Sequence, residues 1–189
     1  MKKVGILGGT FDPPHLGHFI IANEVKEELE LDEIWFMPNQ EPPHKVRSNS
    51  VPASDRVRML ELGITGQPGF KVETIELDRQ GPSYTYDTIK LLNELYEQYS
   101  FYFIIGADMV EYLPKWHNIN ELITMVRFIG VNRPAYELES DYPITYANVP
   151  DVAISSSLIR DRLQKGRSIA FLVPHEIRDY IKEKKLYGS

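Results

Sequence analysis

The stretch Lys3–His18, KVGILGGTFDPPHLGH, passes from a short apolar segment through two glycines and two prolines to a pair of histidines. Its first part, Lys3–Leu7, has the length and apolar character of a strand buried in a sheet. Beyond it, apolar side chains recur every four positions, as on one face of a helix (Ile21, Val25 and Leu29). A buried strand that turns through glycines into a helix is typical of α/β folds.

The rest of the chain repeats this alternation. Further strands are predicted over residues 33–37, 70–77, 101–105 and 127–131, and helices over 53–64, 84–99, 157–165 and 174–184. The rhythm predicts an α/β fold with a doubly wound parallel sheet and a C-terminal helical extension. Ligands of such sheets bind beyond the carboxyl ends of the strands, so the residues that follow each strand are the candidates for function.

The composition narrows the function classes. The length of 189 residues suits one domain, and a net charge of −6 argues against a polycationic nucleic-acid binder. The chain has no cysteine, which excludes disulfides, thiolate catalysis and cysteine-type zinc sites. Because no apolar run approaches the roughly 20 residues that a bilayer requires, we expect no membrane partner and a cytoplasmic protein.

The segment after the first strand has the features of an anion site. Gly8 and Gly9 allow the backbone to approach a phosphate closely, and the following helix offers free N–H groups and a positive dipole end. His15 and His18 are three residues apart and share one face of the helix start. The segment matches neither the P-loop nor the dinucleotide-binding glycine pattern. The alternative is a strand–turn–helix corner with two incidental histidines.

Two motifs together resemble those of the nucleotidylyltransferase superfamily. GGTFDPPHLGH is similar to its T/HxGH signature, and Ile154–Arg160, ISSSLIR, is similar to its ISSTxIR motif. Ser157 stands where threonine is usual, but the substitution keeps the hydroxyl. Alone, the second motif would be compatible with an N-capped surface helix. The resemblance implies a single domain over residues 1–189, with a Rossmann-like core at 1–150 and a helical part at 151–189.

The resemblance also implies adenylyl transfer, in which a substrate phosphate attacks the α-phosphorus of ATP and pyrophosphate leaves. No protein nucleophile is needed, so catalysis consists of positioning and charge stabilisation. The implied catalytic residues are His18, His15 and Thr10. The implied ATP contacts are Gly8, Gly9, Thr10, Phe11, His15, His18, Gly106, Asp108, Ser156, Ser157 and Arg160. Mg²⁺ would bridge phosphate oxygens, mostly without protein ligands.

Three further segments suggest the acceptor: residues 37–45, 83–88 and 106–117. Together they resemble the bacterial nicotinate mononucleotide adenylyltransferases along essentially the whole chain. Trp116 would stack on the pyridine ring, and Thr85, with the backbone near Tyr112, would bind the carboxylate. The remaining residues expected near the mononucleotide or its phosphate are Asn39, His44, Lys45 and Arg133.

Each of these assignments has a plainer alternative. Trp116 could be a core or interface residue, Asp108 could cap the following helix, and Lys45 could be a solvated loop charge. For the whole chain, the alternatives are another acceptor, such as nicotinamide mononucleotide, phosphopantetheine or FMN, or a nucleotide sensor without turnover. From the resemblance, the expected partners are ATP and nicotinate mononucleotide. We also expect a possible homodimer, although no motif supports it.

Overall fold

The computed structural model describes residues 1–40, 51–79, 84–132 and 140–189. Within these residues six strands form one parallel sheet in the order β3-β2-β1-β4-β5-β6. The strands are β1 (Lys2–Gly9), β2 (Glu33–Pro38), β3 (Phe70–Val72), β4 (Tyr99–Gly106), β5 (Arg127–Asn132) and β6 (Ile144–Asn148). The strand order reverses between β1 and β4, which is the switch point where such sheets bind ligands.

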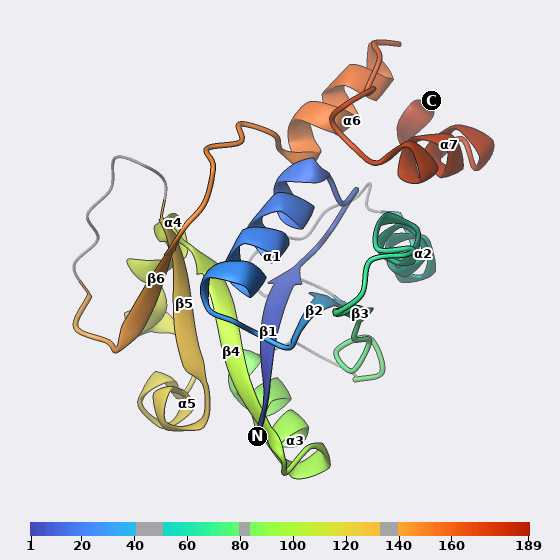
Figure 1. Ribbon diagram of the computed structural model, residues 1–189. Coiled ribbons are helices and arrows are strands. Elements are labelled where there is room, and N and C mark those ends of the chain that lie inside the picture. The colour runs from blue at the N-terminus through green and yellow to red at the C-terminus, as the bar shows by residue number, and fades with distance from the viewer. Residues whose placement is uncertain (41–50, 80–83, 133–139) are drawn as a thin grey trace.

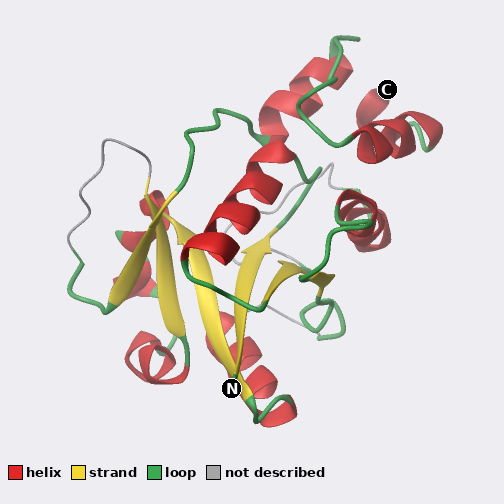
Figure 2. Cartoon of the chain, in the orientation of Figure 1, coloured by secondary structure: helices red, strands yellow, loops and turns green. Residues whose placement is uncertain are grey.

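Helices cover both faces of the sheet (Figure 2). One face carries α1 (Leu16–Glu28) and α2 (Ala53–Gly63), and the other carries α3 (Thr85–Leu95), α4 (Ala107–Val110), the 3-10 turn η1 (Leu113–Lys115) and α5 (Ile119–Met125). This arrangement confirms the predicted doubly wound, Rossmann-like α/β fold.

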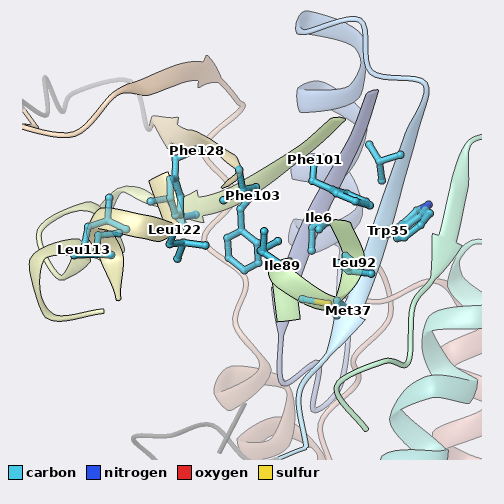
Figure 3. Packing of buried hydrophobic residues seen from close by; sticks show 14 of the residues in the cluster. Ile6, Trp35, Met37, Ile89, Leu92, Phe101, Phe103, Leu113, Leu122 and Phe128 are labelled. Carbon is cyan, nitrogen blue, oxygen red and sulfur yellow. The ribbon is translucent and has the colours of Figure 1, made fainter. Parts of the chain in front are cut away.

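The core lies on both sides of β4. Phe101 and Phe103 point to the α3 and α5 side, whereas Tyr102 and Ile104, which alternate with them, point to the α1 side, as the alternation of a strand requires. Figure 3 shows the first side, where Phe103 lies beside Ile89 of α3 and Phe128 lies beside Leu122 of α5. Burial of each such side chain stabilises the fold by about 2 kcal/mol.

A third cluster joins the C-terminal helices to the rest of the chain. It consists of α2 residues and residues of α6 (Ser156–Gln164), of α7 (His175–Glu183) and of the segment between them: Met59, Ile159, Ile169, Val173, Ile177 and Ile181. A backbone bond from Leu16 N–H to the carbonyl of Leu172, 2.9 Å long, ties this part to the start of α1. Figure 1 shows α6 beside that end of α1. The helical extension therefore lies next to the residues that follow β1.

Some predicted boundaries were wrong. The strand predicted over 70–77 ends at Val72, because the chain then forms a turn closed by Leu77 N–H on the carbonyl of Thr74. The helix predicted over 84–99 ends at Leu95, which is 61% exposed, and Tyr96 packs against the core in its place. Strand β6, at the edge of the sheet, was not predicted. Among the described residues no helix is long and apolar enough to cross a membrane.

Candidate active site

Side chains from two helices hold the β1–α1 loop, residues 10–15, by its carbonyl groups. Arg56 of α2 donates from Nη1 to the Thr10 carbonyl at 2.7 Å. Arg160 of α6 donates from Nη1 to the Asp12 carbonyl at 2.6 Å, and the Ser156 hydroxyl donates to the Pro13 carbonyl at 2.9 Å. The two sequence motifs, far apart in the chain, thus meet at the carboxyl end of β1.

His15 and His18 form a stacked pair at the start of α1, with ring centroids 3.7 Å apart. The backbone N–H of His15 donates to Nδ1 of His18 at 3.1 Å, so the proton of a neutral His18 ring lies on Nε2. Burial lowers the pKa of His15 to about 4. Burial, with the neighbouring His15, lowers the pKa of His18 well below its usual value. Both rings are therefore neutral near pH 7, and Nε2 of His18 is a hydrogen-bond donor.

Gly17 is needed for packing against this pair. A Cβ atom at Gly17 would lie 3.0 Å from Nδ1 of His15, closer than nearly all real contacts. The His15 ring occupies the space beside Gly17, so the glycine allows the two histidines to stack.

The start of α6 presents hydroxyl groups to the same loop. Ser155 caps the helix by accepting the N–H of Leu158 at 3.2 Å, so the N-capped alternative describes part of this motif's role. Ser157 accepts a hydrogen bond from Nη2 of Arg160 at 3.1 Å. The guanidinium group of Arg160 has five N–H bonds, and two of its nitrogens donate hydrogen bonds within the described residues.

Of the residues expected around the acceptor, Asn39, Thr85, Tyr112 and Trp116 are among the described residues. Asn39 follows β2 and donates its backbone N–H to the Gly9 carbonyl at 3.0 Å. Its side-chain Oδ1 is buried without a partner in the described part of the chain. Thr85 is the first residue of α3. Gly106 ends β4 and holds the N-cap position of α4, so Asp108, the second residue of that helix, does not occupy it.

Trp116 connects this region to the carboxyl end of β1 through one aromatic ring. It packs edge-to-face against Phe103 and Phe128, with centroid distances of 5.9 and 5.8 Å. A Cβ at Gly8 would lie 3.2 Å from the same Phe103 ring. Trp116 is only partly buried, so it is a core contact with remaining exposed surface. Tyr112 is 53% exposed nearby in the sequence.

Some candidates stay untested by this geometry. His44, Lys45 and Arg133 lie outside the described residues, as does the side chain of Asp108. Conversely, the sequence interpretation assigned no role to Arg56, Asp12 or Tyr187. In the structure the charged side chains of Asp12 and Arg56 are buried, at 1% and 2% exposed. For Arg56 a signal existed, because it shares a helix face with Met59 and Leu60.

The chain is similar in sequence to a known protein family and to its members. Residues 6–162 match a family model described as cytidylyltransferase-like. A probable nicotinate-nucleotide adenylyltransferase of Geobacillus thermodenitrificans is 58% identical over the whole chain and 88% of its own length. The nicotinate-nucleotide adenylyltransferase of Bacillus subtilis is 50% identical over the full length of both.

Solved structures of similar fold carry the same kind of name as these relatives. The nicotinic acid mononucleotide adenylyltransferase of Plasmodium falciparum complexed with NaAD superposes with a TM-score of 0.79 at 25% identity, over 100% of this chain and 98% of that one. Its complex with APC gives a TM-score of 0.78 at the same identity and coverage. With its two motifs joined at the β1–α1 loop and relatives of this similarity, the chain belongs to the nicotinate-nucleotide adenylyltransferase family of cytidylyltransferase-like proteins.

Proposed function

We propose that this protein transfers AMP from ATP to nicotinate mononucleotide, giving nicotinate adenine dinucleotide (NaAD, deamido-NAD) and pyrophosphate in NAD biosynthesis. The observation that carries the proposal is the neutral His18 ring, which has Nδ1 bonded to the chain and Nε2 left as a donor beside the start of α1. The names of the relatives and the NaAD complex of the Plasmodium enzyme support the choice of acceptor.

In this mechanism the triphosphate lies between the β1–α1 loop and the start of α6. His18 donates from Nε2 to an oxygen of the α-phosphate, and Thr10 and His15 help to position it. Ser156, Ser157 and Arg160 contact the β- and γ-phosphates. A phosphate oxygen of the mononucleotide attacks the α-phosphorus in line. The new P–O bond forms as the bond to the bridging oxygen breaks, and pyrophosphate leaves with that oxygen.

A Mg²⁺ ion would arrive on the triphosphate and would need few protein ligands. Asp12, the carboxylate of the β1–α1 loop, is buried and accepts a hydrogen bond from Tyr187. Mg²⁺ commonly keeps water and phosphate oxygens as ligands, and it would reduce the negative charge on the phosphates during transfer.

The acceptor pocket uses the start of α3 and the ring of Trp116. Thr85, at the first position of an eleven-residue helix, offers hydroxyl and backbone N–H groups to the nicotinate carboxylate, with the backbone near Tyr112 as a further donor. Trp116 offers exposed surface to the pyridine ring. Within the described residues the amide oxygen of Asn39 has no hydrogen-bond partner, which supports a hydrogen bond between it and a donor group of the mononucleotide. His44, Lys45 and Arg133 are assigned to the mononucleotide on the sequence resemblance alone.

Pyrophosphate release distinguishes this enzyme from a nucleotide sensor. With ATP and nicotinate mononucleotide, the wild-type protein should release pyrophosphate continuously, whereas a sensor would bind ATP without release. His18→Ala should reduce turnover at least about a hundredfold, as the loss of one transition-state donor often does. His175→Ala is the matched control, because the His175 side chain is 74% exposed. Unchanged turnover in His18→Ala would refute the role of His18.

The homodimer and the cytoplasmic location stay predictions. In the C-terminal part, Phe171 is 90% exposed and Leu158 is 39% exposed, which makes them the apolar side chains a second copy would cover. Sedimentation velocity of the wild-type protein and of Phe171→Ser would test the dimer. A monomeric wild-type protein at micromolar concentration would contradict it.

A further inference from the structure

The carboxylate of Asp12 is buried in the middle of the β1–α1 loop. It is 1% exposed, and its Oδ1 accepts a hydrogen bond from the Tyr187 hydroxyl at 2.7 Å. Its Oδ2 has no hydrogen-bond partner in the described part of the chain. The guanidinium group of Arg56 interacts electrostatically with both Asp12 and Tyr187, and that of Arg160 interacts with Tyr187. A buried carboxylate with one firm hydrogen bond depends strongly on that bond.

Tyr187 comes from the last residues of the chain, which take an unusual backbone conformation. Lys185 has φ 52° and Tyr187 has φ 60°, both in the left-handed region that non-glycine residues avoid, and Gly188 follows with φ 80°. Chain ends usually fray, and strained residues persist only where surrounding contacts hold them. Here Ser189 N–H donates to the Leu186 carbonyl at 3.1 Å. We call residues 185–189 the C-terminal turn.

The hydroxyl of Tyr187 remains a donor throughout the working range of pH. Burial, the charge of Asp12 and the hydrogen bond to it all raise the pKa of this phenol above its usual value. The contact therefore joins a protonated phenol to the β1–α1 loop. From Asp12 the connection to the histidines is short, because the ring of its neighbour Phe11 packs against His18 with centroids 4.9 Å apart.

We infer that the C-terminal turn positions the ATP site: the hydrogen bond from Tyr187 to Asp12 holds the β1–α1 loop in the shape that aligns His15 and His18 with the triphosphate. Tyr187 touches no reacting atom in this scheme and is a positioning residue. The inference rests on the proposed function for its kinetic consequences, but its effect on ATP binding can be measured without any acceptor.

The chain contains a matched contact for control. Tyr180 of α7 donates to Oδ1 of Asp55 at 2.7 Å, which is the same chemistry at the same length. Both bonds tie the C-terminal part to the rest of the molecule. The partner of Tyr180, however, lies on α2 and not on the β1–α1 loop. Loss of either hydroxyl should affect stability, whereas only loss of the Tyr187 hydroxyl should affect ATP.

The test compares Tyr187→Phe and Tyr180→Phe with the wild-type protein. Calorimetric Kd for ATP, steady-state KM and kcat for both substrates, and urea unfolding would be measured for each. Tyr187→Phe should weaken ATP binding and raise KM for ATP about tenfold, as expected for one lost hydrogen bond to a charged group. Its KM for the mononucleotide should change less than twofold, and Tyr180→Phe should leave all three constants within twofold.

Two outcomes would overturn the inference. One is an ATP Kd in Tyr187→Phe within twofold of the wild-type value. The other is an equal weakening in Tyr180→Phe, which would indicate a general loss of stability. Hydrogen exchange in the folded proteins gives a second readout, since the loop amides, those of Thr10, Phe11, Asp12 and His15, should lose protection only in Tyr187→Phe. A wild-type protein that binds ATP but forms no dinucleotide would instead refute the proposed function, and the binding comparison would still decide the inference.

Discussion

Lowering the pH from 7 to 5 should destabilise the folded protein through His15. The pKa of this buried ring is lowered to about 4, whereas in the unfolded chain it returns to its ordinary 6.5. A group whose folded pKa is depressed contributes fully above the unfolded pKa, and stability is lost as the pH falls towards the folded pKa. Between pH 7 and pH 5 these two values give a loss of about 2 kcal/mol from His15 alone.

The measurement is the free energy of unfolding by urea at both pH values, for the wild-type protein and for His15→Asn. Asparagine suits the N-cap position that His15 occupies and does not titrate in this range. Fluorescence can report the transition, since the ring of Trp35 is fully buried. The variant should lose about 2 kcal/mol less than the wild-type protein on acidification.

His175→Asn is the control for this comparison, because the side chain of His175 is 74% exposed. It should lose as much stability as the wild-type protein. If His15→Asn also lost as much, the ring of His15 would not be buried in its neutral form, and the inferred protonation states of the histidine pair would be incorrect.

Three further predictions concern ATP, a glycine and the acceptor. Because a bound triphosphate favours charged histidines, ATP binding near pH 5.5 should take up protons. The calorimetric enthalpy of ATP binding should then depend on the ionisation enthalpy of the buffer, and an enthalpy that is the same in all buffers would contradict this. Gly17→Ala should destabilise the fold by about 1–3 kcal/mol and reduce turnover, because the new Cβ would lie 3.0 Å from Nδ1 of His15. Urea unfolding and a turnover assay measure these two effects, and wild-type values in both would contradict the prediction. Trp116→Ala should raise KM for nicotinate mononucleotide about tenfold with little change in KM for ATP, because stacking worth about 1–1.5 kcal/mol is lost. Steady-state kinetics that show an equal rise in KM for ATP would contradict a contact between Trp116 and the pyridine ring.

The sequence predicted the fold because its signals were local. Apolar runs such as Phe101–Ile105 and the helical stripes that separate them follow from burial on both faces of a sheet. The meeting of the β1–α1 loop and Ser156–Arg160 was also foreseeable, though only from the resemblance of two motifs. Strand β6 was missed, since five residues at a sheet edge carry little periodic signal.

The buried network behind the loop could not be predicted in the same way. Asp12, Arg56 and Tyr187 come from three distant parts of the chain, and only tertiary packing brings them together. No periodicity marks Tyr187, which lies beyond the last helix in residues with left-handed φ values. The packing of Gly17 against His15 was not predictable either, because this contact depends on the stacked geometry of the two histidine rings.

The proposed reaction is tested most directly by competition between two acceptors. Equal concentrations of nicotinate mononucleotide and nicotinamide mononucleotide would be mixed with ATP, Mg²⁺ and the protein, and the dinucleotides quantified by mass spectrometry at low conversion. The product ratio equals the ratio of kcat/KM values. If the start of α3 near Thr85 binds the nicotinate carboxylate as proposed, NaAD should exceed NAD at least about tenfold, because a neutral amide gains less from a helix N-terminus. A ratio near one, or an excess of NAD, would contradict the assignment of nicotinate mononucleotide as the acceptor.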